Sequence, residues 1–333
     1  MARRNWKQRR LDNDVLGAIK TRFELRYPKG VAQVITDAPD LVQAAGLGWD
    51  LAPIAFVAGD PIPPAVATLK RGGVMPLLAF DCDDSAARMA EYLIDRGIPY
   101  IAASVTDTAL YMHVSRPTRQ AITQTRETAG ALGLAHVDVF DFCNIAQFID
   151  VTREVEGKYV EVGVFNGVSG MFALNYMRLT GVERSCVFMD VFEGFVYAEA
   201  LKSADAFWMA THVNGDPMDI VAERLRSMAG DGVTVDVRRH NIISDEFPGD
   251  LDPIAVANLD VDMYDAVYAG LLALAPRMAP RGVIICEDAG HSGAMIGARV
   301  AVNKFMRTPE SKPFMPITME SGQVVLVNVG AAG

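Results

Sequence analysis

The sequence predicts an α/β protein whose larger part is a doubly wound parallel sheet that ends in an antiparallel hairpin. Apolar runs of strand length alternate with helical patterns along most of the 333 residues. Half of the residues are hydrophobic and 22% are charged, a balance typical of a packed globular chain. No apolar run approaches the ~20 residues of a membrane span. We therefore expect a two-domain α/β protein without a membrane partner.

Residues 1–130 are expected to form the smaller α/β domain. From residue 51 onward, strands alternate with helices, which implies right-handed crossovers and a small parallel sheet. No recognisable chemical motif lies in this part, so its role stays open. The expected elements are strands at 51–58, 74–80 and 99–104 and helices at 63–71 and 85–96.

Residues 131–333 are expected to form the larger domain, in which the alternation is stronger. Helices at 115–132 and 137–152 lead into it. Five strands interleaved with helices, followed by two strands split by a turn at 320–322, predict a doubly wound sheet with an antiparallel edge. The expected strands are 159–164, 186–190, 233–238, 254–260, 283–286, 314–319 and 324–329, and the helices are 169–179, 199–213, 218–229, 264–278 and 297–306.

The charge balance is acidic, with 41 acidic and 31 basic residues, a net charge of −10 and a pI of about 5.0. This balance argues against a dedicated nucleic-acid binder, which would show a basic face. Residues 1–30 differ, because they carry nine basic and three acidic residues. We favour a solvated, partly disordered terminus there over an arm that docks on a neighbouring subunit.

The four cysteines lie far apart and form no Cys-x-x-Cys pair, so we expect small buried thiols in a reducing compartment. The basic N-terminal stretch is followed by Asp12 and Asp14, where a secretory signal would have an apolar core. We therefore expect a cytoplasmic protein that acts on a small molecule, binds neither nucleic acid nor membrane, and forms homo-oligomers.

The first chemical signal is the segment 161–170, which ends a predicted strand and opens a helix. Its glycines let a ligand approach the backbone, and the helix N-terminus presents free amides. Asp190 ends the next predicted strand, where a carboxylate can accept both hydroxyls of a ribose. This pair indicates a ribose-bearing cofactor, either a nicotinamide nucleotide or S-adenosylmethionine. The candidate cofactor-binding residues are Glu161, Gly163, Phe165, Asn166, Gly167, Ser169 and Asp190.

Two of these residues bear on the choice of cofactor. Phe165 occupies the second glycine position of the dinucleotide-binding pattern Gly-x-Gly-x-x-Gly. Glu161 favours S-adenosylmethionine, because an anion beside the loop suits the ammonium group of a methionine moiety and repels a pyrophosphate.

The second chemical signal is a set of carboxylates at two strand ends. Asp260 ends one predicted strand, and Glu287 and Asp288 end the next, 27 and 28 residues later. This spacing fits a strand–helix–strand unit whose neighbouring strands lie ~4.8 Å apart, so the carboxylates are expected to converge. Converging acids repel unless they are protonated or neutralised by a cation. An all-oxygen set suits Mg²⁺, so these three residues are the predicted metal ligands.

These motifs resemble the macrocin O-methyltransferase family, which comprises metal-dependent class I methyltransferases that modify sugars of natural products. The resemblance covers roughly residues 135–330 and includes both signals described above. The matching stretches are 159–170, 187–195, 247–251, 259–264, 280–290, 298–305 and 322–324.

The resemblance implies a Rossmann-like methyltransferase fold and methyl transfer from S-adenosylmethionine to a hydroxyl of a small, sugar-containing natural product. It implies that Glu161, Gly163 and Gly167 surround the methionine part and that Asp190 binds the ribose. It also implies Mg²⁺ on the three carboxylates. The chain departs from the pattern at Glu287, where sugar-modifying members commonly have aspartate and the cephalosporin-hydroxylase-like relatives have glutamate.

Methyl transfer to oxygen requires that the acceptor hydroxyl be positioned and deprotonated. Asp260 is the predicted catalytic base, with His212 and His291 as alternatives. Two other functions stay open: an NAD-dependent oxidoreductase of Rossmann type, and a non-catalytic methyltransferase-like binding module. The absent Gly-x-Gly-x-x-Gly pattern counts against the first, and the intact set of acids counts against the second.

Overall fold

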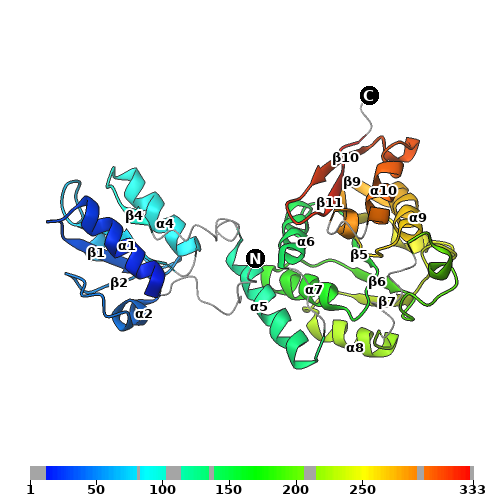
Figure 1. Cartoon of the computed structure of the whole chain (residues 1–333), viewed down its shortest axis with the longest axis horizontal. Coiled ribbons are helices and arrows are strands. Elements are labelled where there is room, and N and C mark those ends of the chain that lie inside the picture. Colours follow the sequence, from blue (N-terminus) through cyan, green and yellow to red (C-terminus); the bar gives the residue numbers. More distant parts are fainter. Residues whose placement is uncertain are drawn as a thin grey trace. The chain divides into compact units, whose positions relative to one another are not determined.

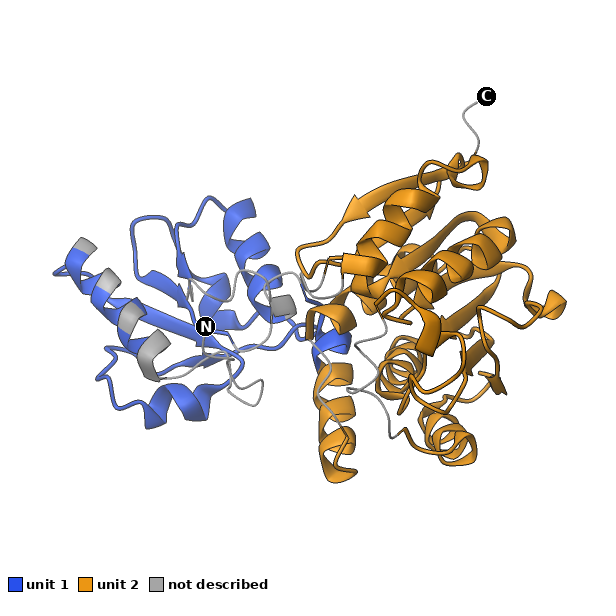
Figure 2. Cartoon of the chain, turned by 45° about the vertical axis from the view of Figure 1, so that its right-hand side comes forward, with its two compact units in different colours: residues 1–119 blue, residues 120–333 orange. Residues whose placement is uncertain are grey.

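The computed structural model describes residues 13–80, 83–102, 114–134, 139–205, 215–290 and 296–330. The chain divides into two compact units, residues 1–119 and residues 120–333 (Figure 2). Each unit has hydrophobic clusters of its own, so each is described by itself.

Unit 1 contains a four-stranded parallel sheet in the order β2-β1-β3-β4, which confirms the predicted small parallel sheet. The central strand β1 is buried along its whole length, whereas β2 and β4 are only two residues long. The strands are β1 (Ala32–Thr36), β2 (Ile54–Ala55), β3 (Met75–Leu78) and β4 (Ile101–Ala102), and the helices are α1 (Asn13–Arg26), α2 (Pro39–Ala44), α3 (Pro64–Ala67) and α4 (Asp83–Asp95).

Helix α1 corrects the expectation of a partly disordered basic terminus, which is wrong for residues 13–26. Leu16, Ile19 and Phe23 are at most 4% exposed and pack in one cluster with Val34 of β1 and Leu77 of β3. The three apolar residues follow a helical spacing among charged neighbours and so form a buried stripe. Residues 1–12 lie outside the described part of the chain.

Unit 2 contains a seven-stranded sheet in the order β10-β11-β9-β8-β5-β6-β7 (Figure 1). Strands β5 to β9 are parallel, and β11 pairs antiparallel with both β9 and β10. The predicted doubly wound sheet with an antiparallel terminal hairpin is therefore confirmed. The strands are β5 (Lys158–Val162), β6 (Cys186–Asp190), β7 (Val235–Arg239), β8 (Ile254–Leu259), β9 (Met278–Cys286), β10 (Phe314–Thr318) and β11 (Val324–Asn328).

Helices cover both faces of this sheet, because alternate residues of β5 contact different helices. Glu161 contacts Ser169 of α7, whereas Val160 and Val162 lie in the cluster that includes residues of α9 and α10. The described helices of unit 2 are α5 (Arg116–Ala131), α6 (Val139–Val151), α7 (Val168–Thr180), α8 (Met218–Met228), α9 (Tyr264–Leu274) and α10 (Ile296–Phe305). Of the helix expected at 199–213, the described part contains one 3₁₀ turn, Ala200–Lys202.

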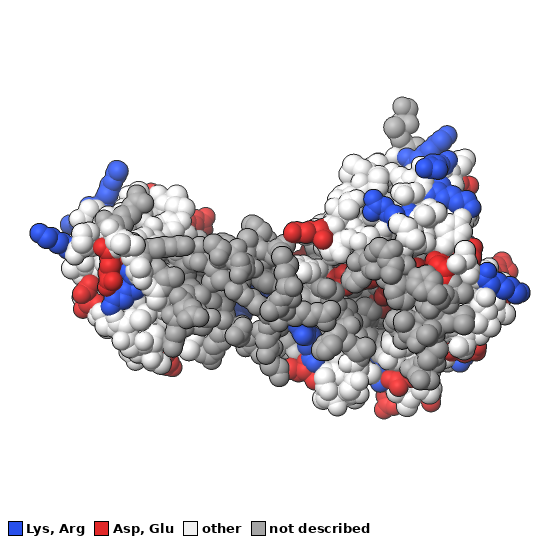
Figure 3. Space-filling model, viewed as in Figure 1, with Lys and Arg blue, Asp and Glu red and all other residues white. Residues whose placement is uncertain are grey.

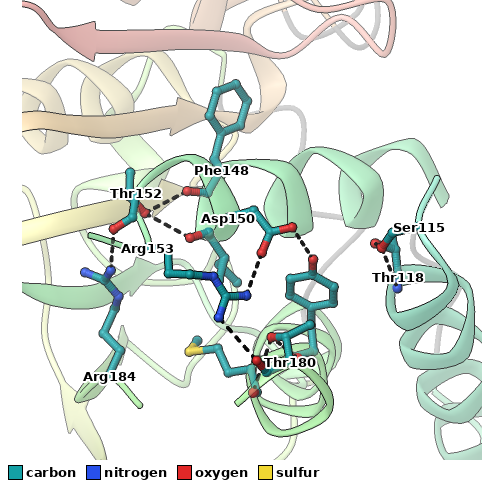
Figure 4. A network of polar contacts seen from close by, with 11 residues as sticks. Ser115, Thr118, Phe148, Asp150, Thr152, Arg153, Thr180 and Arg184 are labelled. Carbon is teal, nitrogen blue, oxygen red and sulfur yellow. Dashed lines mark hydrogen bonds and ion pairs between the residues drawn. The ribbon is translucent and has the colours of Figure 1, made fainter. Parts of the chain in front are cut away.

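A polar network fixes the end of the sheet opposite to the strands' carboxyl ends (Figure 4). The buried Arg184 guanidinium donates to the carbonyl oxygens of Thr152, Val155 and Gly157 at 2.7–3.1 Å. Arg153 pairs with Asp150 at 3.1 Å and donates to a carbonyl at the end of α7. The connection between α6 and β5 is therefore tied to the start of β6, which leaves the opposite edge free for ligands.

The described surface gives two observations on partners. None of the described helices combines the length and the apolar character that a membrane crossing requires. In Figure 3, Lys and Arg side chains of unit 2 gather over α10 and the segment after it, where Lys304, Arg307 and Lys312 are exposed. Elsewhere on this side, charges of both signs are interspersed.

Candidate active site

The carboxyl ends of β5, β6, β8 and β9 meet at one edge of the sheet of unit 2. The strand register aligns Val162, Met189, Leu259 and Cys286 at or next to the ends of these strands. The residues that follow them therefore stand in a row across the edge: Gly163, Asp190, Asp260 and Glu287. In an open α/β sheet, this edge is where ligands bind.

The loop from β5 to α7 depends on its two glycines. Gly163 has φ +90°, and a Cβ atom there would lie 1.6 Å from the Asp260 carbonyl oxygen. Gly167 precedes α7 in the left-handed conformation, with φ +79°. The absence of side chains thus lets the loop lie directly against the end of β8 and against α8.

Asp190 holds this loop through the backbone. Its Oδ2 accepts the N–H groups of Val164 (2.7 Å) and Phe165 (2.8 Å), and its Oδ1 accepts the N–H of Phe192 (2.7 Å). Phe165 has a left-handed φ of +47°, which a non-glycine residue adopts only when its surroundings fix it. The carboxylate therefore orders the loop itself. Its predicted contact with a ribose stays a prediction, and the half-buried side chain has further lone pairs to offer.

Glu161 lies beneath the same loop and is fully buried. Its carboxylate accepts hydrogen bonds from the Tyr159 hydroxyl (2.8 Å) and from Ser169 Oγ (2.7 Å). Burial raises the pKa of Glu161 to about 7, although these two donors oppose the shift. Ser169 thus contacts Glu161, and the Glu161 carboxyl group lies below the start of α7, where its predicted role toward the cofactor stays a prediction.

The polar groups of Asn166 accept hydrogen bonds from other residues of the protein. Its Oδ1 accepts the Asp216 N–H at 2.8 Å, and its carbonyl oxygen accepts Arg224 Nη1 at 2.5 Å. The side chain therefore joins the loop to the chain that enters α8, and a direct role at the cofactor stays a prediction.

Three carboxylates converge on the other half of the edge. Oxygen atoms of Asp260, Asp262 and Asp288 lie within 4.8 Å of one another, and Asp288 Oδ2 accepts the Asp262 N–H at 2.9 Å. Burial and the neighbouring carboxylates raise the pKa values of Asp260 and Asp288. Such a set of oxygen donors, costly to ionise together, fits a divalent cation such as Mg²⁺.

Glu287 lies beside this group but outside the three. Burial and the charges of Asp260 and Asp141 raise its pKa, and its carboxyl is hydrogen-bonded to Asp141 of α6. Asp141 is 3% exposed, so α6 adds a fifth acid to the region. Glu287 as a metal ligand stays a prediction.

Residues 130–318 match the macrocin-O-methyltransferase (TylF) family, a stretch of more than half of the chain. The chain belongs to this family. The family match thus contains the whole row of strand ends and the loop. It begins within α5, in the same region of the chain where unit 2 begins.

This chain is similar to a protein of Streptomyces olivaceus, 8-demethyl-8-(2,3-dimethoxy-alpha-L-rhamnosyl)-tetracenomycin-C 4'-O-methyltransferase. The two are 28% identical over 170 residues, which are 47% of this chain and 61% of the relative. The chain thus spans about three-fifths of the relative's length.

Solved structures with a similar fold include the O-methyltransferase NovP, with 21% identity and a TM-score of 0.49 over 56% of this chain and 78% of NovP. The calicheamicin methyltransferase CalS11 has 16% identity and a TM-score of 0.45 over 63% of this chain and 91% of its own.

Two acids of the candidate active site were not predicted from the sequence, Asp262 and Asp141. Asp262 lies in the stretch 259–264 that resembles the family, but a strand pattern alone does not show that φ +56° turns its N–H toward Asp288. Asp141 carries no signal in the sequence, because only the packing of α6 brings it to Glu287. The alternative bases His212 and His291 lie outside the described residues.

Proposed function

We propose that the protein transfers a methyl group from S-adenosylmethionine to a hydroxyl of a small, sugar-bearing natural product, with Mg²⁺ at the acidic cluster. The observation that carries the proposal is the family match over 130–318, which contains both the loop and the convergent carboxylates. The relative's name, a rhamnosyl 4'-O-methyltransferase, supports a glycoside as acceptor.

On this proposal, the two halves of the edge divide the work. The loop and Asp190 bind and orient the methyl donor. The Asp190 carboxylate fixes two backbone amides of the loop before the donor binds. Glu161 lies beneath the start of α7, and in its ionised form it would favour the ammonium group of the donor. Orientation of two reactants in one site removes much of the entropic barrier to transfer.

Asp260, Asp262 and Asp288 are the residues that would hold the metal ion, with Glu287 beside them. When bound, Mg²⁺ supplies positive charge that lowers the pKa of an acceptor hydroxyl. Asp260 stands next to Gly163 in the row of strand ends, which supports its proposed role as the group that accepts the hydroxyl proton close to the donor.

Methyl transfer to defined acceptors tests this proposal. The purified protein is incubated with S-adenosylmethionine labelled in its methyl group and with pairs of rhamnosylated compounds and their aglycones. We expect label in the glycosides only, loss of transfer with EDTA, and recovery with Mg²⁺. Transfer that is unaffected by EDTA would contradict the metal role, and transfer to the aglycones alone would contradict the sugar acceptor.

A further inference from the structure

Helix α8 packs directly on the cofactor loop and on the start of α7, and α7 and α8 lie side by side in Figure 1. A Cβ atom at Gly167 would lie 3.1 Å from Val221, and one at Gly170 would lie 2.8 Å from Leu225. Val221 and Leu225 are fully buried and lie on one face of α8. Arg224 is adjacent to Leu225 and three positions from Val221, so the same face carries it to the loop.

Arg224 closes a ring of three hydrogen bonds with Asn166 and Asp216, which we name the Arg224 clamp. Arg224 Nη1 donates to the Asn166 carbonyl oxygen (2.5 Å), and Arg224 Nη2 pairs with Asp216 Oδ2 (2.7 Å). The Asp216 N–H donates to Asn166 Oδ1 (2.8 Å). The Arg224 side chain is only 10% exposed, whereas that of Asp216 is 36% exposed, so the guanidinium group is largely enclosed by the protein and the ion pair is open to water on the Asp216 side.

The clamp and Asp190 hold neighbouring residues of the loop. Asp190 accepts the N–H groups of Val164 and Phe165, and Arg224 binds the next residue along the chain. Phe165, with its left-handed φ of +47°, lies between these two attachments. Gly215 lies against its ring, at 3.5 Å from a Cβ built on the glycine to the nearest ring carbon. A strained backbone of this kind persists only where its surroundings over-determine it.

We propose that Arg224 and Asp216 are positioning residues that hold the cofactor loop in its binding conformation and join it to the chain that enters α8. This inference rests on the proposed function, because the loop matters only if it binds the donor. A loop that is ordered before binding loses less conformational entropy when the ligand arrives. Neither residue needs to contact the donor for this effect.

The test measures S-adenosylhomocysteine binding by calorimetry for Arg224→Gln, Asp216→Asn and the double variant, with Arg226→Gln as the control. Arg226 is exposed on the same helix, so its variant keeps the helix but leaves the clamp intact. We expect each single clamp variant to weaken binding at least about tenfold, because each loses the charge-assisted hydrogen bond between Arg224 and Asp216. The double variant should lose no more affinity than the single variant that binds S-adenosylhomocysteine less tightly, because the two residues act as one unit. Wild-type affinity in both single variants, or additive losses in the double variant, would overturn the proposal.

Hydrogen exchange without ligand provides a readout that does not depend on the proposed function. The Gly167 N–H donates to the Val164 carbonyl oxygen at 2.7 Å, so this amide reports on the closed loop. We expect faster exchange across 164–167 in both clamp variants and unchanged exchange in β8 and in the Arg226→Gln variant. If the parent protein bound no donor, the proposed function would fail, and unchanged exchange in the loop would overturn the clamp separately. Asp216 lies outside α8, so its variant keeps the test valid if Arg224→Gln does not fold.

Discussion

At the scale of single residues, the site is marked by three non-glycine residues with left-handed backbone. Phe165 follows β5, Phe192 follows β6 and Asp262 follows β8, with φ between +47° and +56°. Each donates its N–H to a site carboxylate, the first two to Asp190 and the third to Asp288. Each such conformation costs of order 1–3 kcal/mol, so the acids hold the backbone at the edge in strained positions.

Removal of Asp190 is expected to weaken both the loop and the donor site. Asp190→Ala should reduce S-adenosylmethionine affinity by about a hundredfold or more, since the two predicted charge-assisted hydrogen bonds to the ribose would contribute about 1.5–3 kcal/mol each. It should also lower the free energy of unfolding without ligand by about 2–4 kcal/mol, because three backbone N–H groups lose their acceptor. Calorimetry measures the change in affinity, and urea denaturation measures the change in stability. Unchanged affinity of the variant would contradict a role of Asp190 in binding the donor.

Glu161 is expected to make stability depend on pH. Its pKa is raised by burial from 4.5 to about 7, so the folded state holds this proton more tightly than the unfolded state. The stabilising contribution is therefore present below about pH 4.5 and is lost as pH rises through about 7. Glu161→Gln should therefore reduce the fall in the free energy of unfolding over this pH range by up to about 3 kcal/mol. Urea denaturation of parent and variant between pH 4.5 and 8 measures it, and parallel curves would contradict the shift.

At the scale of elements, the close approach of the β5–α7 loop to β8 requires glycine. A Cβ at Gly163 would meet the Asp260 carbonyl oxygen, which is backbone and cannot rotate away. Gly181, which ends α7, shares a left-handed φ of +67° but has no atom within 4 Å of its Cβ position. Substitution of Gly163 would therefore add both a steric clash and backbone strain, whereas substitution of Gly181 would add backbone strain alone.

Gly163→Ala is expected to cost several kcal/mol of stability and to abolish donor binding, because β5 and β8 must separate. Gly181→Ala should cost only about 1 kcal/mol, the strain of a left-handed alanine, and leave donor binding unchanged. Thermal denaturation and calorimetry of both variants give the comparison. Equal losses of stability would show that contact with the Asp260 carbonyl oxygen does not constrain the loop.

At the scale of the whole molecule, the acidic cluster makes stability depend on pH and, on the proposed function, on a bound cation. Asp260, Glu287 and Asp288 have pKa values raised by burial, so their ionisation opposes folding as pH rises. A cation that binds only the folded state offsets this repulsion and stabilises the protein by mass action.

Mg²⁺ is therefore expected to raise the melting temperature, and to do so more at pH 8 than at pH 5.5. At a hundred times its dissociation constant, the ion would add about 2.7 kcal/mol. Asp260→Asn should lose this response and all turnover while keeping its affinity for S-adenosylmethionine. Asp219→Asn, which changes an exposed acid in α8, is the control. An undiminished Mg²⁺ response in Asp260→Asn would exclude Asp260 from the metal site.

Much of unit 2 was predictable because its buried parallel strands are continuous apolar runs that end in chemically distinct residues. Asp190, the last residue of β6, and Asp260, which directly follows β8, illustrate this. Strand β1 was missed because the polar Gln33 interrupts its pattern, and only the fold shows that Gln33 donates to the Ala52 carbonyl oxygen at 2.6 Å. Asp141 was not predictable, because its position depends on the packing of α6.

The central claim is that the edge at the carboxyl ends of β5 and β6 binds S-adenosylmethionine. Isothermal titration of the full chain with S-adenosylmethionine and, separately, with NAD tests it most directly. The account predicts one saturable site for S-adenosylmethionine, weakened in Asp190→Ala, and no heat of binding with NAD. Binding of NAD without binding of S-adenosylmethionine would contradict it.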